Sequence, residues 1–351
     1  MRRNIQTLMI GPLPNYKTGR VGGAAISFSY LWDYFRRHKL SHYVLDTRPF
    51  DRDRRRYFHV PILFYRTLRC LPTTDVVFVN MSMGGTRYIA PILFIIAKAF
   101  GRKFVFRPFG SRMKEEYEQY GTIQKWIFHR TLLRSELLLL QTEALCDYFR
   151  PLTNNVRQLP TSRDAAEPTY KKVNPTYQKR FIYLGRILPS KGIDYLLAAK
   201  KQLGADYTIH LYGAIEDEKY NYLKEEDSIY KGVLGRDAVT PVLAQYDVLI
   251  LPTFFEGEGY PGAIIEAYSL GIPVIATQWK SIPEIVEHEQ TGLLIPPKSV
   301  TAIIEAIQYF NQDNYPTFSK KAEQTFDERF SAKMVLKQMM TQFLDILTEE
   351  K

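Results

Sequence analysis

Short runs rich in β-branched and aromatic residues alternate with longer amphipathic stretches along the whole chain, and this alternation constrains the fold most strongly. Strands separated by helix-length segments pair in parallel through crossover helices. The rhythm occurs once in each half of the 351 residues, a length that favours two domains. We therefore predict an α/β protein with two parallel sheets. Strands are expected at 7–10, 43–46, 76–79, 104–107 and 137–141 in the first half, and at 181–184, 207–212, 248–251 and 274–276 in the second.

A polar segment with two prolines, residues 162–180, separates the two halves and is interpreted as a linker. The predicted domains are residues 1–165 and 166–330. Apolar residues recur at helical spacing after Ser331, so residues 331–351 are expected to form a C-terminal helix that packs back toward the N-terminal domain.

Charge is distributed unevenly between the halves. Residues 1–165 contain 27 Lys and Arg against 12 Asp and Glu, a net +15, whereas residues 166–351 contain 20 against 25, a net −5. A basic N-terminal half favours an anionic partner there. Arginines and aromatic residues are interleaved between Arg48 and Arg69, a composition that suits an anionic membrane surface. The alternatives are a solvated basic surface and arginines that pair with acids on neighbouring helices.

No signal peptide or membrane span is predicted. The apolar stretch after Arg3 is interrupted by polar residues, glycine and proline, and the longest apolar run, residues 88–100, is too short to cross a bilayer. The two cysteines, Cys70 and Cys146, form no CxxC pair. These features indicate a cytoplasmic protein, and peripheral contact with the inner face of the membrane is a hypothesis that the basic half suggests.

The segment Glu256–Ala276 carries the most specific pattern. A predicted strand is followed by a turn with three glycines, and a helix begins near Gly262. Glycines let the backbone approach a ligand closely, and a helix N-terminus suits a diphosphate. Glu258 lies on the turn and Glu266 lies about one helical turn inside the helix. One carboxylate can therefore face a sugar while the other reaches hydroxyl groups beyond the phosphates.

A second strand–turn–helix element covers residues 183–197, in which Gly185 and Gly192 flank Arg186 and Lys191. Two cations at the carboxyl end of a strand suit two phosphate groups, because Arg presents a fork of donors and Lys a point charge. Ligands of open α/β sheets bind at this edge. An arginine and a lysine at this spacing would by themselves be interpreted as two solvated charges. The prediction of a phosphate site therefore depends on this element together with residues 256–276.

Together these elements resemble the retaining glycosyltransferases of the GT-B architecture, group 1 or family 4, in which two Rossmann-like domains face a cleft. The family's two glutamates, separated by seven residues, match Glu258 and Glu266, and the resemblance spans residues 181–297. It implies that Arg186 and Lys191 hold the donor diphosphate, that Glu258 contacts the transferred sugar and that Glu266 binds the donor ribose. The implied catalytic group is Glu258, Arg186 and Lys191, and further donor contacts are implied for Gly259, Tyr260, Gly262 and Ala263.

The N-terminal half matches the family more loosely. Residues 10–24 resemble the first strand and glycine loop, an arrangement in which Gly22 and Gly23 line the cleft under the donor phosphates. Many relatives have a histidine after the strand at 104–107, whereas this chain has Arg107–Ser111 and no histidine there. Arg107 is therefore a candidate on the acceptor side.

The resemblance implies sugar transfer from a nucleotide-diphosphate donor with retention of configuration. It also implies a lipid-linked, polysaccharide or lipopolysaccharide acceptor in cell-surface glycan biosynthesis. The negative charge that develops on the leaving nucleoside diphosphate can be stabilised by Arg186, Lys191 and the helix N-terminus, so neither a metal nor a cofactor is expected. The pattern Asp51-Arg52-Asp53 could bind a metal, but it lies in an arginine run and not after an apolar strand.

Other functions would require different features of the sequence. A nucleotide-sugar epimerase on this architecture would convert its donor without an acceptor. A sugar phosphorylase needs a cofactor lysine and a longer chain, and a dehydrogenase needs Gly-x-Gly-x-x-Gly, which Gly19–Gly23 does not match. A nucleic-acid-binding protein would explain the basic half. It is not favoured, because no helix-turn-helix, zinc or RNP pattern is present.

Overall fold

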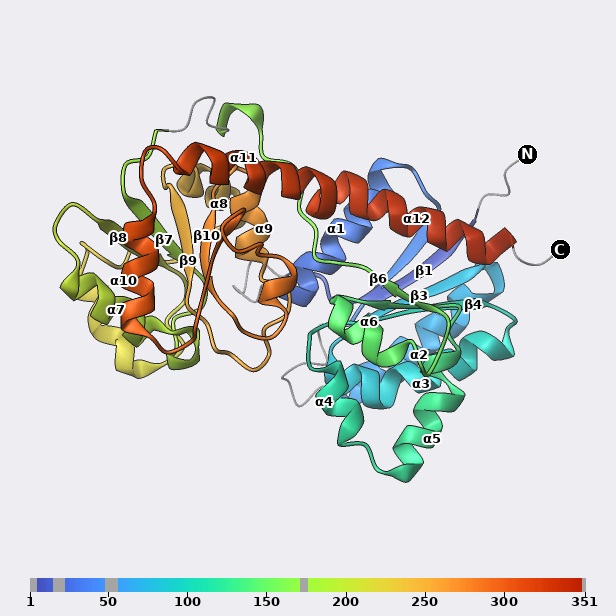
Figure 1. Ribbon diagram of the computed structural model, residues 1–351. Helices are drawn as coiled ribbons and strands as arrows, with labels where there is room; N and C mark the ends of the chain where they lie inside the picture. The colour runs from blue at the N-terminus through green and yellow to red at the C-terminus, as the bar shows by residue number, and fades with distance from the viewer. Residues whose placement is uncertain (1–4, 15–22, 48–55, 171–175, 349–351) are drawn as a thin grey trace. The chain divides into compact units, whose positions relative to one another are not determined.

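The computed structural model describes residues 5–14, 23–47, 56–170 and 176–348, and the chain divides into two compact units (Figure 1). The first unit comprises residues 1–160 and 335–351, and the second comprises residues 161–334. The sequence pattern placed the divisions at positions 165 and 330.

The first unit is built on a six-stranded sheet in the order β2-β1-β3-β4-β5-β6, and all neighbouring strands pair in parallel. Its strands are β1 (Thr7–Gly11), β2 (His42–Asp46), β3 (Val76–Met81), β4 (Lys103–Pro108), β5 (Leu137–Leu140) and β6 (Val156–Gln158). The five expected strands are present. The sequence pattern missed β6, in which only Val156 is buried.

Helices cover both faces of the first sheet. One face packs against α2 (Arg56–Cys70), α3 (Met83–Ala99), α4 (Met113–Glu118), α5 (Thr122–Arg130) and α6 (Glu143–Phe149) in a shared core. The other face is covered by α1 (Gly23–Arg37) and by α12 (Ala332–Thr348), on which Phe343 packs against Phe35. Strand residues alternate between faces, so Phe104 and Phe106 point into the shared core and Arg107 points toward α1.

The second unit contains a five-stranded parallel sheet in the order β11-β10-β9-β7-β8. Its strands are β7 (Arg180–Leu184), β8 (Thr208–Tyr212), β9 (Val248–Leu251), β10 (Val274–Thr277) and β11 (Gly292–Ile295). Its helices are α7 (Ile193–Gln202), α8 (Arg236–Leu243), α9 (Gly262–Tyr268), α10 (Val300–Tyr309) and α11 (Tyr315–Thr325). The four expected strands are present, and β11 was not expected. The predicted class, α/β with two Rossmann-like parallel sheets, is confirmed.

The start of the segment interpreted as a linker, residues 162–180, is built into the second unit. Arg163 is nearly buried, its N–H donates to the Phe330 carbonyl at 3.1 Å, and its carbonyl accepts from the Ala332 N–H at 2.7 Å. This short parallel bridge joins two segments of the second unit, one just after the chain enters that unit and one just before the chain leaves it. Polar composition alone was therefore a poor guide to where the chain leaves a folded unit.

In the described part of the chain, no helix combines the length and the apolar character needed to cross a membrane. Cys70 and Cys146 are both free thiols.

Candidate functional site

A tight connection after β7 positions Lys191. The chain forms a 3₁₀ turn at Pro189–Lys191 and then enters α7 at Ile193. Gly192 between them has φ of +75°, in the left-handed region that favours glycine. A Cβ at Gly192 would also overlap the carbonyl oxygen of Pro252, so glycine lets this turn approach the loop after β9.

Hydrogen bonds join three loops at the carboxyl edge of the second sheet. The Phe254 N–H donates to the Ser190 carbonyl at 2.8 Å, which ties the loop after β9 to the loop after β7. From the segment at the end of β10, the Thr277 hydroxyl donates to the Thr253 carbonyl, and Trp279 Nε1 donates to the Phe255 carbonyl at 2.9 Å. The edge at which open α/β sheets bind ligands is thus a connected framework.

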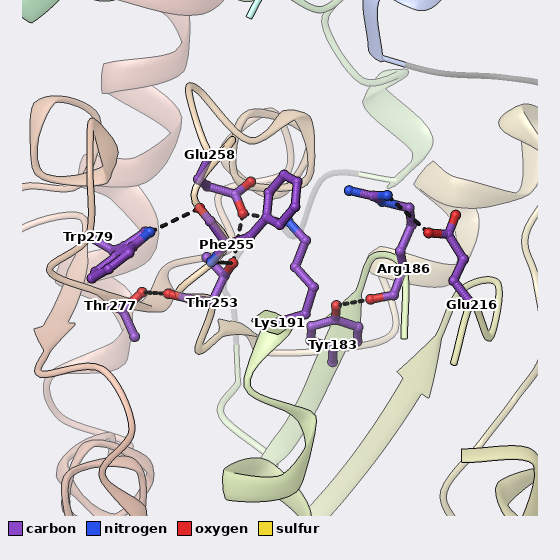
Figure 2. A network of polar contacts seen from close by, with 9 residues as sticks. All are labelled: Tyr183, Arg186, Lys191, Glu216, Thr253, Phe255, Glu258, Thr277 and Trp279. Carbon is purple, nitrogen blue, oxygen red and sulfur yellow. Dashed lines mark hydrogen bonds and ion pairs between the residues drawn. The ribbon is translucent and has the colours of Figure 1, made fainter. Parts of the chain in front are cut away.

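Lys191 and Glu258 form an ion pair within this framework. Both side chains are about nine-tenths buried, and the Thr253 hydroxyl donates to the same Glu258 oxygen at 2.7 Å. Figure 2 shows the two charged groups pointing toward one another beside the Phe255 ring. Each charge neutralises the other, and this permits burial that neither group could sustain alone.

The ring of Phe255 contacts both of the cationic side chains that were predicted to bind the diphosphate. Its centroid lies 4.9 Å from Lys191 Nζ and 5.1 Å from Arg186 Cζ. The Arg186 side chain is half-exposed and pairs with Glu216 at 3.0 Å. The Tyr183 hydroxyl donates to the Arg186 carbonyl at 2.6 Å, and burial raises the pKa of Tyr183 well above its ordinary value, so the hydroxyl stays protonated. Arg186, Lys191 and Glu258 are thus brought together, as expected.

A residue that the sequence pattern did not single out holds Glu266 on α9. Arg163 Nε lies 2.6 Å from Glu266 Oε1, and the Arg163 side chain is buried while that of Glu266 is one-quarter exposed. The guanidinium lies against Gly262, where a Cβ would overlap Nη2. The partners are 103 residues apart in the chain, so no local pattern could have identified Arg163.

Three donor-binding candidates on the glycine turn and α9 differ in their surroundings. Gly259 and Ala263 are partly exposed. Tyr260 is nearly buried, and its hydroxyl donates to Glu284 at 2.7 Å. The Tyr260 side chain therefore packs inside the second unit, a placement that its position in the motif did not reveal.

The N-terminal candidates lie in the first unit. Gly23 is the first residue of α1, whereas Gly22 and the Asp51–Asp53 pattern lie outside the described residues. Arg107 is nearly buried at the end of β4, and its Nη2 donates to the Ser27 hydroxyl oxygen at 2.8 Å. Across the described ranges, no group of three His, Cys, Asp or Glu side chains is placed to hold a metal ion.

The second unit matches a known family. Residues 178–313 match the family model described as glycosyl transferases group 1. The putative colanic acid biosynthesis glycosyltransferase WcaL of Escherichia coli is 26% identical over 181 residues, which cover 47% of this chain and 45% of that protein. The amylovoran biosynthesis glycosyltransferase AmsK of Erwinia amylovora is 29% identical over 146 residues, or 38% of this chain and 36% of that protein. The matches span about a third to a half of these relatives' length.

The fold of both units also has known counterparts. The crystal structure of HepE from Anabaena in complex with UDP matches with a TM-score of 0.72 at 15% identity, over 97% of this chain and 100% of that one. At this identity the likeness shows the fold, which consists of two Rossmann-like domains as in GT-B structures. The predicted resemblance to the group 1 glycosyltransferases is confirmed for residues 178–313.

Proposed function

We propose that this chain, in which residues 178–313 match the family model described as glycosyl transferases group 1, moves a sugar from a nucleotide-diphosphate donor to a glycan or lipid-linked acceptor. The observation that carries this proposal is the meeting of Lys191, Arg186 and Glu258 around Phe255, at the carboxyl edge of the second sheet. Two cations beside a carboxylate match a ligand in which a diphosphate adjoins hydroxyl groups.

Each group has a role that follows from its surroundings. Lys191 has three N–H donors, so it can bind a phosphate oxygen while keeping its contact with Glu258. Arg186 is half-exposed and can turn its guanidinium from Glu216 to a second phosphate. Glu258 accepts hydrogen bonds from the sugar. Glu266, oriented by Arg163, accepts hydrogen bonds from the ribose hydroxyls.

The chemical step breaks the bond between the anomeric carbon and the donor phosphate oxygen. The leaving nucleoside diphosphate takes the electron pair, and Lys191 and Arg186 stabilise its growing negative charge. The acceptor hydroxyl oxygen bonds to the anomeric carbon on the face from which the phosphate departs, and its proton passes to the departing phosphate oxygen, so the configuration is retained. We assign no metal to this step, because these two side chains supply the positive charge.

We assign the acceptor to the cell-surface glycans. The named relatives support this assignment, since WcaL and AmsK are described as colanic acid and amylovoran biosynthesis glycosyltransferases. The acceptor would then be a growing polysaccharide, a lipopolysaccharide or a lipid-linked sugar.

Binding of donors tests the proposal. A panel of UDP-, GDP- and TDP-sugars should contain one that raises the unfolding temperature, because a ligand at 100 times its Kd stabilises a protein by about 2.7 kcal/mol. Arg186→Ala and Lys191→Ala should each weaken that ligand by about 1.5–3 kcal/mol, roughly 10- to 150-fold in Kd, since each removes a hydrogen bond to a charged group.

Lys219→Ala is the matched control, because Lys219 is an exposed lysine of the same unit that pairs with Asp194 at 2.7 Å. Its donor affinity should equal that of wild type. Unchanged nucleotide-diphosphate affinity in both site variants contradicts the assignment. Turnover is measured in EDTA, and activity that is lost there and returns with Mn²⁺ or Mg²⁺ would contradict the metal-free step.

We further infer that the first unit docks on an anionic membrane surface. The helices α2, α3 and α5 contain no Asp or Glu and seven Lys and Arg. All three pack against the same core and so lie on one side of the sheet. Their outer surfaces carry large exposed apolar side chains: Ile62, Tyr65, Leu68, Tyr88, Ile92, Ile95, Ile123 and Trp126. Apolar groups beside basic ones suit an anionic lipid surface, where each basic residue contributes about 1 kcal/mol. The arginine run at 48–55 lies outside the described residues.

Liposome sedimentation checks the docking surface. Wild type should bind vesicles that contain anionic lipid, and binding should fall with added salt. Both Arg66→Gln/Arg69→Gln and Ile123→Ser/Trp126→Ser should reduce binding, the first by removing charge and the second by removing apolar area. The control Tyr222→Ser/Val233→Ser changes exposed apolar residues of the second unit and should bind as wild type does. A wild type that ignores anionic vesicles at low salt would contradict docking but not sugar transfer.

A further inference from the structure

Arg107 carries a charge that the first unit buries without neutralising it. Its side chain is 4% exposed, and within the described part of the chain it forms no ion pair. Its hydrogen bond goes to the neutral hydroxyl oxygen of Ser27 on α1. Burial lowers the pKa of the guanidinium to about 10, so it stays charged at neutral pH. The guanidinium carbon also lies 6.0 Å from the centroid of the Phe109 ring. A buried charge without a counterion costs several kcal/mol.

Asn80 lies beside Arg107 in the sheet. The two residues are paired neighbours in the parallel strands β3 and β4, so their side chains lie on the same face of the sheet. Asn80 is completely buried, and neither its Oδ1 nor its Nδ2 has a hydrogen-bond partner among the described residues. On the loop after β4, the buried hydroxyl of Ser111 likewise has no partner in the part of the chain that the structure describes. Each unsatisfied buried polar group costs about 1–3 kcal/mol.

The first turn of α1 packs closely against this region. Gly11 ends β1, and a Cβ there would overlap the ring of Phe28 on α1. Gly23 begins α1, and a Cβ there would lie 3.5 Å from the ring of Phe109, which follows β4. Arg107 and Asn80 therefore lie on the α1 side of the sheet near the carboxyl ends of adjacent strands, the edge at which such sheets bind ligands.

We propose that Arg107 and Asn80 form an anion-binding site in the first unit, with Ser27 as a positioning residue. The ligand is a phosphate or carboxylate group carried by a substrate. A guanidinium fork matches two oxygens of such a group, and the Asn80 amide supplies a further donor. The residues of this site belong to the first unit, whereas the Lys191 cluster belongs to the second. Only the identity of the carrier, a donor diphosphate or an acidic acceptor, rests on the proposed function.

Inorganic phosphate is the first probe. It is titrated into the full chain carrying Arg186→Gln and Lys191→Gln, which removes the cations of the second unit. Phosphate should still raise the unfolding temperature of this double variant in a saturable way. Addition of Arg107→Met should weaken the response at least tenfold, whereas Arg150→Met, a change of an exposed arginine of the first unit, should leave it unchanged. A phosphate response that is the same with and without Arg107 overturns the proposal.

The stability of the ligand-free chain separates a binding role from a structural one. Arg107→Met and Asn80→Leu should leave the unfolding temperature unchanged or raise it, because the first removes a buried charge and the second replaces an unsatisfied amide by an apolar group of similar size. A structural role predicts the opposite, and a lower unfolding temperature with unaltered phosphate binding overturns the proposal. If Arg107→Met does not fold, Arg107→Lys serves in its place. It keeps the charge, loses the fork and should bind phosphate more weakly at wild-type stability.

UDP and a competent acceptor distinguish the two carriers. If Arg107→Met weakens UDP binding tenfold or more, the bound group is the donor diphosphate. If UDP affinity is unchanged and the KM for the acceptor rises, the group belongs to an acidic acceptor. A wild type that binds phosphate through Arg107 but binds no nucleotide sugar would refute the proposed function and leave the anion site standing. Equal values for wild type and Arg107→Met in the phosphate, UDP and acceptor measurements refute the site.

Discussion

Lys191→Met and Glu258→Leu, made one at a time, will each lower the free energy of unfolding of the second unit by about 3–5 kcal/mol. Each change leaves one charge of the pair in surroundings where both side chains are about nine-tenths buried. The double variant Lys191→Met/Glu258→Leu will recover most of the loss, because two apolar side chains replace the pair and no charge stays buried alone.

The second unit has its own spectroscopic probe for this experiment. Trp279 donates to the Phe255 carbonyl, and the chain's other two tryptophans, Trp32 and Trp126, lie in the first unit. Denaturant unfolding is followed by Trp279 fluorescence in a Trp32→Phe/Trp126→Phe background. Single variants within about 1 kcal/mol of wild type, with no recovery in the double variant, would show that water already screens the pair. All three variants should lose turnover, since stability and catalysis make different demands on these two residues.

Gly192→Ala will destabilise the second unit by more than about 3 kcal/mol and will weaken donor binding. A non-glycine residue at φ of +75° costs about 1–2 kcal/mol. The added Cβ also overlaps the backbone carbonyl of Pro252, which cannot move aside as a flexible side chain would. The turn must then shift and carry Lys191 away from Glu258.

Gly232→Ala separates these two causes. Gly232 has φ of +87°, but a Cβ there meets no atom within 4 Å. The Gly232→Ala variant should lose only the stability that corresponds to the backbone conformation, about 1–2 kcal/mol, and should keep wild-type donor affinity. The same unfolding experiment measures both variants. Equal losses at the two glycines would show that the contact with Pro252 yields at little cost.

Local patterns were sufficient for the central strands. In a parallel sheet with helices on both faces, inner strands are buried on both sides and form continuous apolar runs, as Val248–Leu251 does. The two missed strands, β6 and β11, each lie at the edge of a sheet. Both are short: β6 has three residues, of which one is buried, and β11 has four, so neither presents a run long enough to be recognised by its pattern.

The candidate site was predictable as separate pieces. Arg186, Lys191 and Glu258 each lie within a few residues of a glycine turn after a predicted strand, and that local context identified them. The pairing of Lys191 with Glu258 across 67 residues depends on β7 and β9 being neighbours in the sheet. Strand order is a property of the assembled sheet, and the spacing of residues along one segment carries no information about it.

Residues whose importance comes from burial could not be identified in the same way. In the sequence, Arg163 is one polar residue in a polar segment. Its role appears only in the folded structure, where it contacts Glu266, 103 residues away. Arg107 is one basic residue among 27 in the first 165, and its burial against α1, with no counterion among the described residues, appears only in the folded structure. The types of residue and their spacing show which functional groups the chain contains and which of them lie on turns. The free energy needed to bury a charged side chain depends instead on how much water is removed from around it. The amount of water removed depends on which distant segments pack against the side chain.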